Sequence, residues 1–252
     1  MYNPCITNNY RKNHMHIEAI TICINYADVL KWTLLSTHHQ FNKMIVVTEE
    51  NDRDTINLCQ YYDVEYVTAE GNKGEKINAA LDKLSKQDWV VHIDADIYLP
   101  PQTINIIRNS QLDHETIYGI DRCMCNSYDD FIEYLSANKK PYDQKYFTNP
   151  PFPVGTRISQ HYDLGYIPIG YFQMWHPSTT KVNKYPVTHQ TEGAYARTDI
   201  LMATQFKKRA LLPSPLCIHL EEGYNNMGAN WNGRTTPVFG PFNLKTIQGY
   251  SN

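Results

Sequence analysis

Hydrophobic and polar residues follow two regular patterns along the first part of the chain. Short runs of apolar and β-branched residues predict buried strands, and apolar residues at helical spacing predict amphipathic helices. The predicted strands are 17–25, 43–48, 64–69 and 89–96, and the predicted helices are 27–39, 52–62, 74–85 and 102–110. Because strands and helices alternate with short connections, we expect an α/β fold with a mostly parallel central sheet and helices on both faces.

The second part of the chain has a weaker pattern. Pro, Tyr, Asn and Gly are frequent there, and 138–165 has the composition of a long loop of the kind that often serves as a lid or binding loop. Strands are predicted at 117–122, 166–175 and 216–222, and a helix at 196–210. We expect one domain over 1–252, with a strand-and-helix half at 1–110 and a less regular half at 111–252.

Composition and charge are those of a globular protein. Hydrophobic residues make up 42% of the 252 residues, charged residues make up 19%, and the formal net charge is −3. The nearest candidate for a basic patch is FKKRALL at 206–212, which we interpret as the solvated end of the predicted helix. The sequence therefore does not indicate a general binder of polyanions.

The cysteines and the apolar segments indicate in which cellular compartment the protein is expected. The six cysteines are scattered without a C-x-x-C pair, which argues against a structural zinc site and for free thiols in a reducing compartment. No apolar stretch is long enough to span a bilayer, and the polar N-terminal stretch lacks the apolar core of a signal peptide. We therefore expect a cytoplasmic protein without a transmembrane segment.

The fourth predicted strand ends in two aspartates, in the stretch WVVHIDAD at 89–96. Asp94 and Asp96 lie where ligands collect in such folds, beyond the carboxyl ends of the parallel strands. Two close carboxylates repel each other unless a cation lies beside them. Mn²⁺ and Mg²⁺ prefer oxygen ligands and leave positions open for phosphate oxygens. The stretch therefore favours a Mn²⁺ or Mg²⁺ site that faces a diphosphate over a merely polar strand end.

Four stretches together resemble a GT-A glycosyltransferase of the family-2 type. They are ITICIN, MIVVTEEND, GNKGEKINAAL and VVHIDADIYLPP, and they fall within about residues 17–107. The resemblance implies a single Rossmann-like GT-A domain that binds a nucleotide-sugar at its strand ends. On this interpretation 1–110 is the nucleotide-sugar-binding half and 111–252 is the acceptor-binding half.

The resemblance also assigns roles to single residues. It implies that Asp94 faces the metal or the donor ribose and that Asp96 ligates the metal. A further ligand often comes from a late strand, and His219 in LCIHLEEG is either that ligand or a core histidine. His92 lies deeper in the predicted sheet, where we expect a structural role. The residues implied for the donor are Asn25, Tyr26, Thr48, Glu49, Asp52, Lys73, Lys76, Asp94 and Arg234.

The chain departs from the family pattern after its first two strands. Many relatives have an acidic residue where this chain has Asn25–Tyr26, followed by Asp28. The stretch TEEND offers Glu49, Glu50 and Asp52, which leaves open the carboxylate that meets the base. Arg234 could neutralise a leaving diphosphate, and the other interpretation is a polar surface turn.

A carboxylate must accept the acceptor's proton in an inverting transfer. Asp199 begins a helix-like run where the family's acidic motif would fall, and Glu192 is the second candidate. Retaining enzymes need no base there, so the stereochemistry stays open. In the aromatic stretch 167–177, the rings of Tyr171, Phe172 and Trp175 either contact an acceptor or belong to the core, and Gln173 and His176 are the better polar candidates.

These observations predict an enzyme that moves a hexosyl or pentosyl group from a nucleotide-diphosphate sugar, with UDP expected, to an acceptor hydroxyl. A nucleotidyltransferase on the same sheet is one alternative, although INYADVLKW lacks the Gly-rich basic loop that such enzymes carry after the first strand. A non-catalytic domain that binds nucleotide-sugar or carbohydrate is the other. The acceptor stays open among a saccharide, a lipid carrier, a protein and a modified DNA base.

Overall fold

A computed structural model describes residues 15–125, 127–136, 147–148, 166–188, 195–220, 233, 239–240 and 242. Its first half alternates as the sequence predicts. The elements are β1 (Ile17–Ile22), α1 (Ala27–Thr37), a 3-10 helix (His38–Gln40), β2 (Lys43–Thr48), α2 (Arg53–Tyr61), β3 (Glu65–Thr68), α3 (Lys73–Leu81) and β4 (Trp89–Ile93). β1 ends before the predicted boundary, and Asn25 in the turn that follows has a left-handed φ of 53°.

The second half agrees less closely with the sequence prediction. Its elements are β5 (Ile97–Tyr98), α4 (Thr103–Arg108), β6 (Thr116–Cys125), α5 (Tyr128–Ser136), β7 (Phe147–Thr148), β8 (Phe172–Trp175), α6 (Pro177–Thr180), α7 (Tyr195–Thr204) and β9 (Lys208–His219). The helix predicted over 196–210 is wrong at its end, because Lys208 pairs with Thr116 and begins β9. Apart from β7, the loop expected at 138–165 lies outside the described residues.

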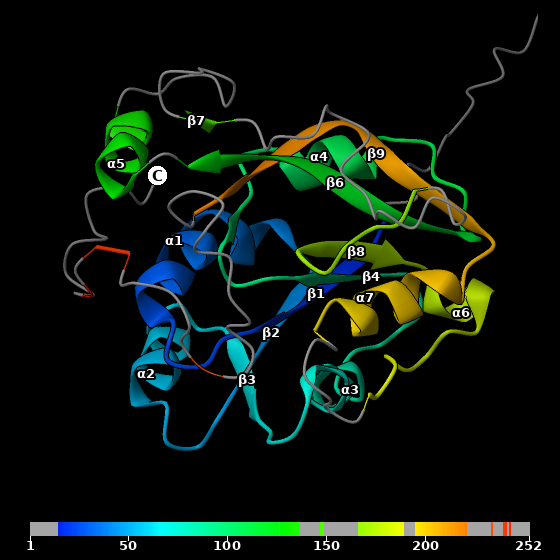
Figure 1. Ribbon diagram of the computed structural model, residues 1–252, viewed down its shortest axis with the longest axis horizontal. Coiled ribbons are helices and arrows are strands. Elements are labelled where there is room, and N and C mark those ends of the chain that lie inside the picture. Colours follow the sequence, from blue (N-terminus) through cyan, green and yellow to red (C-terminus); the bar gives the residue numbers. More distant parts are fainter. Residues whose placement is uncertain are drawn as a thin grey trace, which may run out of the picture.

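The strands form a nine-stranded sheet in the order β3-β2-β1-β4-β8-β6-β9-β5, with β7 beside β6 (Figure 1). β3, β2, β1 and β4 are parallel, β8 is antiparallel to both of its neighbours, and β6 is parallel to β9. The expected α/β class is confirmed, and the parallel strands form a continuous group. Their carboxyl ends therefore share one edge of the sheet.

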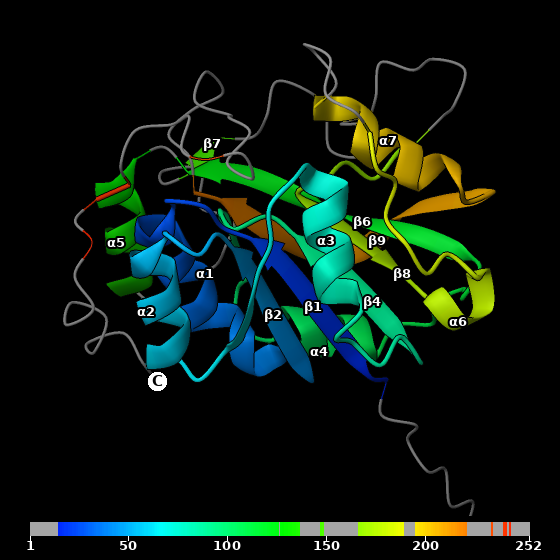
Figure 2. The ribbon, with the colours of Figure 1, turned by 90° about the horizontal axis from the view of Figure 1, so that it is seen from below.

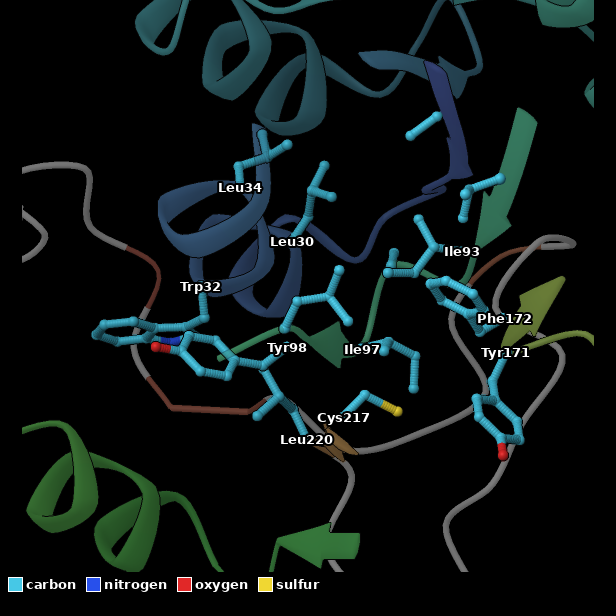
Figure 3. Packing of buried hydrophobic residues seen from close by; sticks show 14 of the residues in the cluster. Leu30, Trp32, Leu34, Ile93, Ile97, Tyr98, Tyr171, Phe172, Cys217 and Leu220 are labelled. Atoms are coloured by element: carbon cyan, nitrogen blue, oxygen red, sulfur yellow. The ribbon is translucent and has the colours of Figure 1, made fainter. Parts of the chain in front are cut away.

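Helices cover both faces of the sheet (Figure 2). Each face has its own hydrophobic cluster. Side chains of α1, α2, α4 and α5 share one cluster, and those of α3 and α7 share the other. Ala19 and Ile20 of β1 belong to different clusters, as expected for neighbours on a strand. Figure 3 shows the first cluster near α1, with Leu30, Trp32, Ile97 and Tyr98 among its members.

Two observations concern the expectations about thiols and membranes. Within the described part of the chain, Cys23, Cys59, Cys123, Cys125 and Cys217 are buried and form no disulfide. Among the described residues, no helix combines the length and the apolar character that a bilayer crossing requires.

The N-terminus of α3 is fixed by local and distant contacts. Asn72 and Glu75 form a reciprocal capping box, which satisfies backbone N–H groups of the first turn. A Cβ on Gly74 would lie 1.9 Å from the carbonyl oxygen of Pro186, so only glycine permits this approach. Asn78 exchanges two hydrogen bonds with the backbone of Tyr185, at 2.9 and 2.7 Å. The segment around 185–187 is thereby held against α3.

A buried histidine caps α6. Nδ1 of His176 accepts from the backbone N–H of Thr179 at 3.4 Å, and Nε2 lies 3.4 Å from Oδ1 of Asp88. The ring stacks on His114 with centroids 4.3 Å apart. Burial, together with the neighbouring His114, lowers the pKa of His176, while Asp88 opposes the change. The neutral ring is therefore the form that the fold stabilises.

We expect the free energy of unfolding to fall as the pH drops below about 6.5, the ordinary pKa of histidine. The folded state has the lower His176 pKa, so the unfolded state binds the proton first, and stability is lost on acidification through this window. Urea unfolding at several pH values, for the wild type and His176→Gln, measures the effect. The variant should show a weaker pH dependence than the wild type. An unchanged pH dependence would contradict the assignment.

Candidate functional site

The two aspartates that follow β4 differ in exposure. The Asp94 side chain is 38% exposed, whereas that of Asp96 is 8% exposed. The backbone N–H of Asp94 donates to the carbonyl of Tyr171 at 3.1 Å, and that of Ile97 donates to the carbonyl of Asp94 at 3.2 Å. The chain thus turns sharply between β4 and β5. The turn leaves one carboxylate accessible and directs the other into the protein.

Asp96 is met by side chains from the second half of the chain. Its Oδ2 lies 3.0 Å from Nε2 of His219, which the pairing of Ile97 with His219 brings to this point. Arg122 lies 3.1 Å from Nδ1 of the same ring and stacks over Tyr171. Burial raises the pKa of Asp96, but His219 and Arg122 outweigh it and the pKa is lowered. Asp96 is therefore held as a carboxylate.

One oxygen of Asp96 has no partner among the described residues. Oδ1 is buried and makes no hydrogen bond there. A buried carboxylate oxygen in this state is costly unless a cation or a donor approaches it. Carboxylate oxygens are suitable ligands for Mn²⁺ or Mg²⁺, so the chemistry of Asp94 and Asp96 fits such an ion, and the imidazole of His219 beside Asp96 would add a nitrogen ligand. Within the described part of the chain, however, no three acidic, histidine or cysteine groups are already arranged around a metal position.

Asp94 faces a buried lysine and a buried histidine. Its Oδ1 lies 3.6 Å from Nζ of Lys73 and 3.6 Å from Nε2 of His92. Removal from water raises the pKa of Asp94 to about 7, with Asp96 and Asp199 adding to the rise and Lys73 opposing it. Burial and Lys73 hold the pKa of His92 well below its ordinary value. His92 is thus a neutral residue beside Asp94, and its structural role stays a prediction.

Asp199 lies in the same buried region. Its Oδ1 is 3.0 Å from Nζ of Lys73, and it accepts a hydrogen bond from the Tyr185 hydroxyl at 2.8 Å. The Tyr185 hydroxyl also lies 2.5 Å from Oε1 of Gln173, whose amide donates to the carbonyl of Asp199 at 2.9 Å. Asp199 has only 8% of its surface exposed. Lys73 therefore lies between Asp199 and Asp94 and contacts both carboxylates.

The end of β2 presents a second group of predicted donor residues. Asp52 accepts from the backbone N–H of Asn25 at 2.6 Å, from the Thr48 hydroxyl at 3.1 Å and from the backbone N–H of Thr55 at 3.2 Å. It is 2% exposed, and all of these bonds lie within the protein. Asp52 therefore joins the turns after β1 and β2 and caps α2.

Glu49 and Glu50 are the accessible carboxylates at this end, and Glu50 is the more exposed of the two. Among the described residues, Glu49 is the one with a basic partner. Its side chain is 31% exposed and accepts from Nζ of Lys76 at 2.9 Å, while Lys76 itself is buried. Asn25 is exposed, whereas Tyr26 and Thr48 are buried. The accessible groups at the ends of β1 and β2 therefore include Asn25, Glu49 and Glu50.

The remaining predicted residues divide into two groups. Glu192 and Arg234 lie outside the described residues. The aromatic stretch belongs to the core, because every side chain considered there is buried: Tyr171, Phe172, Gln173, Trp175 and His176.

Sequence reasoning missed two residues of this region. Arg122 had a signal, since it is a charged residue within an apolar strand. Tyr185 had no comparable signal, because it lies in a polar connecting segment that only the fold brings near Asp199.

A comparison of the sequence with protein-family models identifies a known family. The model described as Glycosyl transferase family 2 matches residues 18–164. The chain belongs to glycosyl transferase family 2. No curated protein matches the chain. The family match covers β1 to β4 and both aspartates, which agrees with the resemblance of the four sequence stretches.

Solved structures share the fold of this family 2 member at low sequence identity. Glucosyl-3-phosphoglycerate synthase from Mycobacterium tuberculosis, in complex with Mn²⁺, UDP-glucose and phosphoglyceric acid, has a TM-score of 0.50 at 13% identity over 87% of this chain and 77% of that one. A structure described as a mycobacterial protein has a TM-score of 0.51 at 12% identity over 87% and 72%. Another complex of the synthase, with Mn²⁺, UDP and phosphoglyceric acid, matches at 16% identity and a TM-score of 0.37 over only 44% of each chain.

The contacts of Asp52 lead to a stability prediction. We expect Asp52→Ala to lower the free energy of unfolding by about 2 kcal/mol, because it removes an N-cap and leaves the N–H of Asn25 without its acceptor. Asp52→Asn should cost less, since the amide oxygen can still accept. Urea unfolding of both variants measures the difference. Wild-type stability in Asp52→Ala would show that these bonds do not hold the two turns together.

Proposed function

We propose that this family 2 member is a metal-dependent glycosyltransferase that moves a hexosyl or pentosyl group from a nucleotide-diphosphate sugar to an acceptor hydroxyl. One observation carries the proposal: Asp94 and Asp96 lie together at the carboxyl end of β4, one accessible and the other buried beside His219. This arrangement is costly for a purely structural role, because burial disfavours the charge of Asp96 and the neighbouring Asp94 repels it.

The residues that would hold Mn²⁺ or Mg²⁺ are Asp94, Asp96 and His219. Asp96 supplies a buried oxygen with no hydrogen bond to any described residue, and Arg122 and His219 keep that carboxylate ionised. When bound, such an ion offsets the negative charge that develops on the leaving diphosphate. The protein's own contribution is to shield Asp96 from bulk water, to leave Asp94 accessible and to fix both carboxylates in direction.

The donor nucleoside is proposed to lie over the ends of β1 and β2. Asn25, Glu49 and Glu50 are accessible groups there, and Lys76 holds Glu49 in place. Tyr26, Thr48 and Asp52 form the buried support beneath them. UDP-sugars are the donors to test first, since the structurally similar synthase was solved in complex with UDP-glucose. Arg234, as a partner of the diphosphate, remains a prediction from the sequence.

The acceptor side is left to experiment. The proposed acceptor is a saccharide, a lipid carrier, a protein or a modified DNA base. Glu192 and Asp199 remain the predicted bases for an inverting transfer, although both oxygens of Asp199 already face Lys73 and one also faces Tyr185. The anomeric configuration of the product distinguishes the inverting from the retaining course.

The first experiment is incubation with a panel of nucleotide-sugars and Mn²⁺. We expect release of a nucleoside diphosphate with at least one donor, because sugar transfer, or transfer to water, breaks the bond between the sugar and the diphosphate. Coupled detection of the diphosphate measures it. A nucleotidyltransferase would instead release pyrophosphate from a nucleoside triphosphate and a sugar phosphate. Binding of donors without any release would indicate the non-catalytic domain and overturn the proposal.

The second experiment tests the carboxylate and the metal together. Asp96→Asn should lower turnover by about 100-fold or more, because an amide is a weak ligand for a hard cation. EDTA should abolish wild-type activity, and added Mn²⁺ should restore it. Asp82→Asn, which changes an exposed aspartate at the end of α3, is the matched control and should keep full activity. Full activity of Asp96→Asn in EDTA would contradict a metal mechanism.

A further inference from the structure

Lys73 lies between two carboxylates in the interior of the site. Its Nζ is 3.0 and 3.3 Å from the two oxygens of Asp199 and 3.6 Å from Oδ1 of Asp94. The Lys73 side chain is 5% exposed, and that of Asp199 is 12% exposed. The ammonium group is within hydrogen-bond distance of Asp199, whereas its contact with Asp94 is a longer ion pair. Lys73 therefore faces Asp199 more closely than it faces Asp94.

The surrounding fold is shaped to hold this pair. Tyr185 donates to Asp199, and Gln173 donates to the carbonyls of Asp199 and Pro168. Gly170 lies against the pair, because a Cβ there would be 2.0 Å from Oδ2 of Asp199 and 2.5 Å from Nζ of Lys73. Elements from both halves of the chain thus fix the position of one ammonium group.

The ammonium group and a metal ion would compete for the same carboxylate. A lysine that turned fully toward Asp94 would neutralise it and repel a divalent cation at short range. Asp199 is a second carboxylate for Lys73, and it lies closer to the ammonium group than Asp94 does. Removing only one member of a buried ion pair leaves the other charge uncompensated.

We propose that Asp199 is a positioning residue, which holds the ammonium group of Lys73 back from Asp94 and so leaves Asp94 available to a divalent cation. Asp199 then acts through Lys73 and not by contact with the acceptor. The inference rests on the proposed function, because the state of Asp94 matters for metal binding only if the site binds a metal. It gives Asp199 a different role from the predicted base.

Mn²⁺ affinity of the purified protein, with and without UDP, tests the proposal without relying on turnover. Calorimetry or the electron paramagnetic resonance of free Mn²⁺ measures it. We expect Asp199→Asn to weaken Mn²⁺ binding by about 10-fold, within the range found when groups around metal ligands are changed. Adding Lys73→Met to this variant should restore the affinity to within about 3-fold of wild type, because the competing charge is gone.

Two comparisons keep the outcome specific. Glu18→Gln removes another buried carboxylate, on β1 beside Val90 at the opposite end of the strands, and should leave Mn²⁺ affinity unchanged. Thermal unfolding should show Lys73→Met alone to be less stable than the double variant, in which neither charge is left unpaired. The matched pair separates a charge effect from a general loss of folding.

Each result decides between the possibilities. Unchanged Mn²⁺ affinity in Asp199→Asn, with turnover strongly reduced, would overturn the positioning role and support the predicted base. Weakened binding that Lys73→Met does not restore would also overturn it, because the loss would then be structural. Absence of Mn²⁺ binding by the wild type, with and without UDP, would count against the proposed function itself, which is a different failure.

Discussion

The balance of charge at the carboxyl end of β4 is the constraint on which the site depends. Asp94 and Asp96 follow a strand whose five residues are all buried, so both carboxylates lie close to the interior. Two neighbouring carboxylates can both stay ionised only where basic groups face them. Lys73 comes from α3, His219 from β9 and Arg122 from β6. The two halves of the chain therefore meet at these carboxylates, because both halves supply the basic groups that face them.

Helix α3 connects the two ends of the site. Lys73 and Lys76 lie one turn apart on its buried side, and each faces a carboxylate on a different element. Lys73 faces the pair around β4 and α7, whereas Lys76 faces Glu49 after β2. The capping box and the close approach of Gly74 to Pro186 fix where this helix begins. A small shift of the helix start would thus move both lysines at once.

The sequence predicted the parts of the structure that have a local signature. β2 begins and ends at the predicted residues, and the two aspartates were found from an apolar strand followed by a D-x-D spacing. The start of β9 was missed, because a short apolar run after a helix satisfies both helical and strand spacing. The contact of Lys73 with Asp199 spans 126 positions and has no local signature at all. Family resemblance gave plausible roles, but only packing shows that Asp52 and Lys73 face other protein groups.

The pairing of the two-residue strand β5 with β9 limits where residues can be inserted into or deleted from β9. Ile97 is opposite His219, and this register directs the imidazole toward Asp96. Side chains alternate along a strand, so a single inserted or deleted residue in β9 near this point would turn the imidazole to the other face of the sheet. The register between β6 and β9 already shifts between Gly119 and Asp121, beside the stretch of β9 that contains Pro213 and Pro215. Length variation is therefore best absorbed at that irregular stretch, upstream of the histidine.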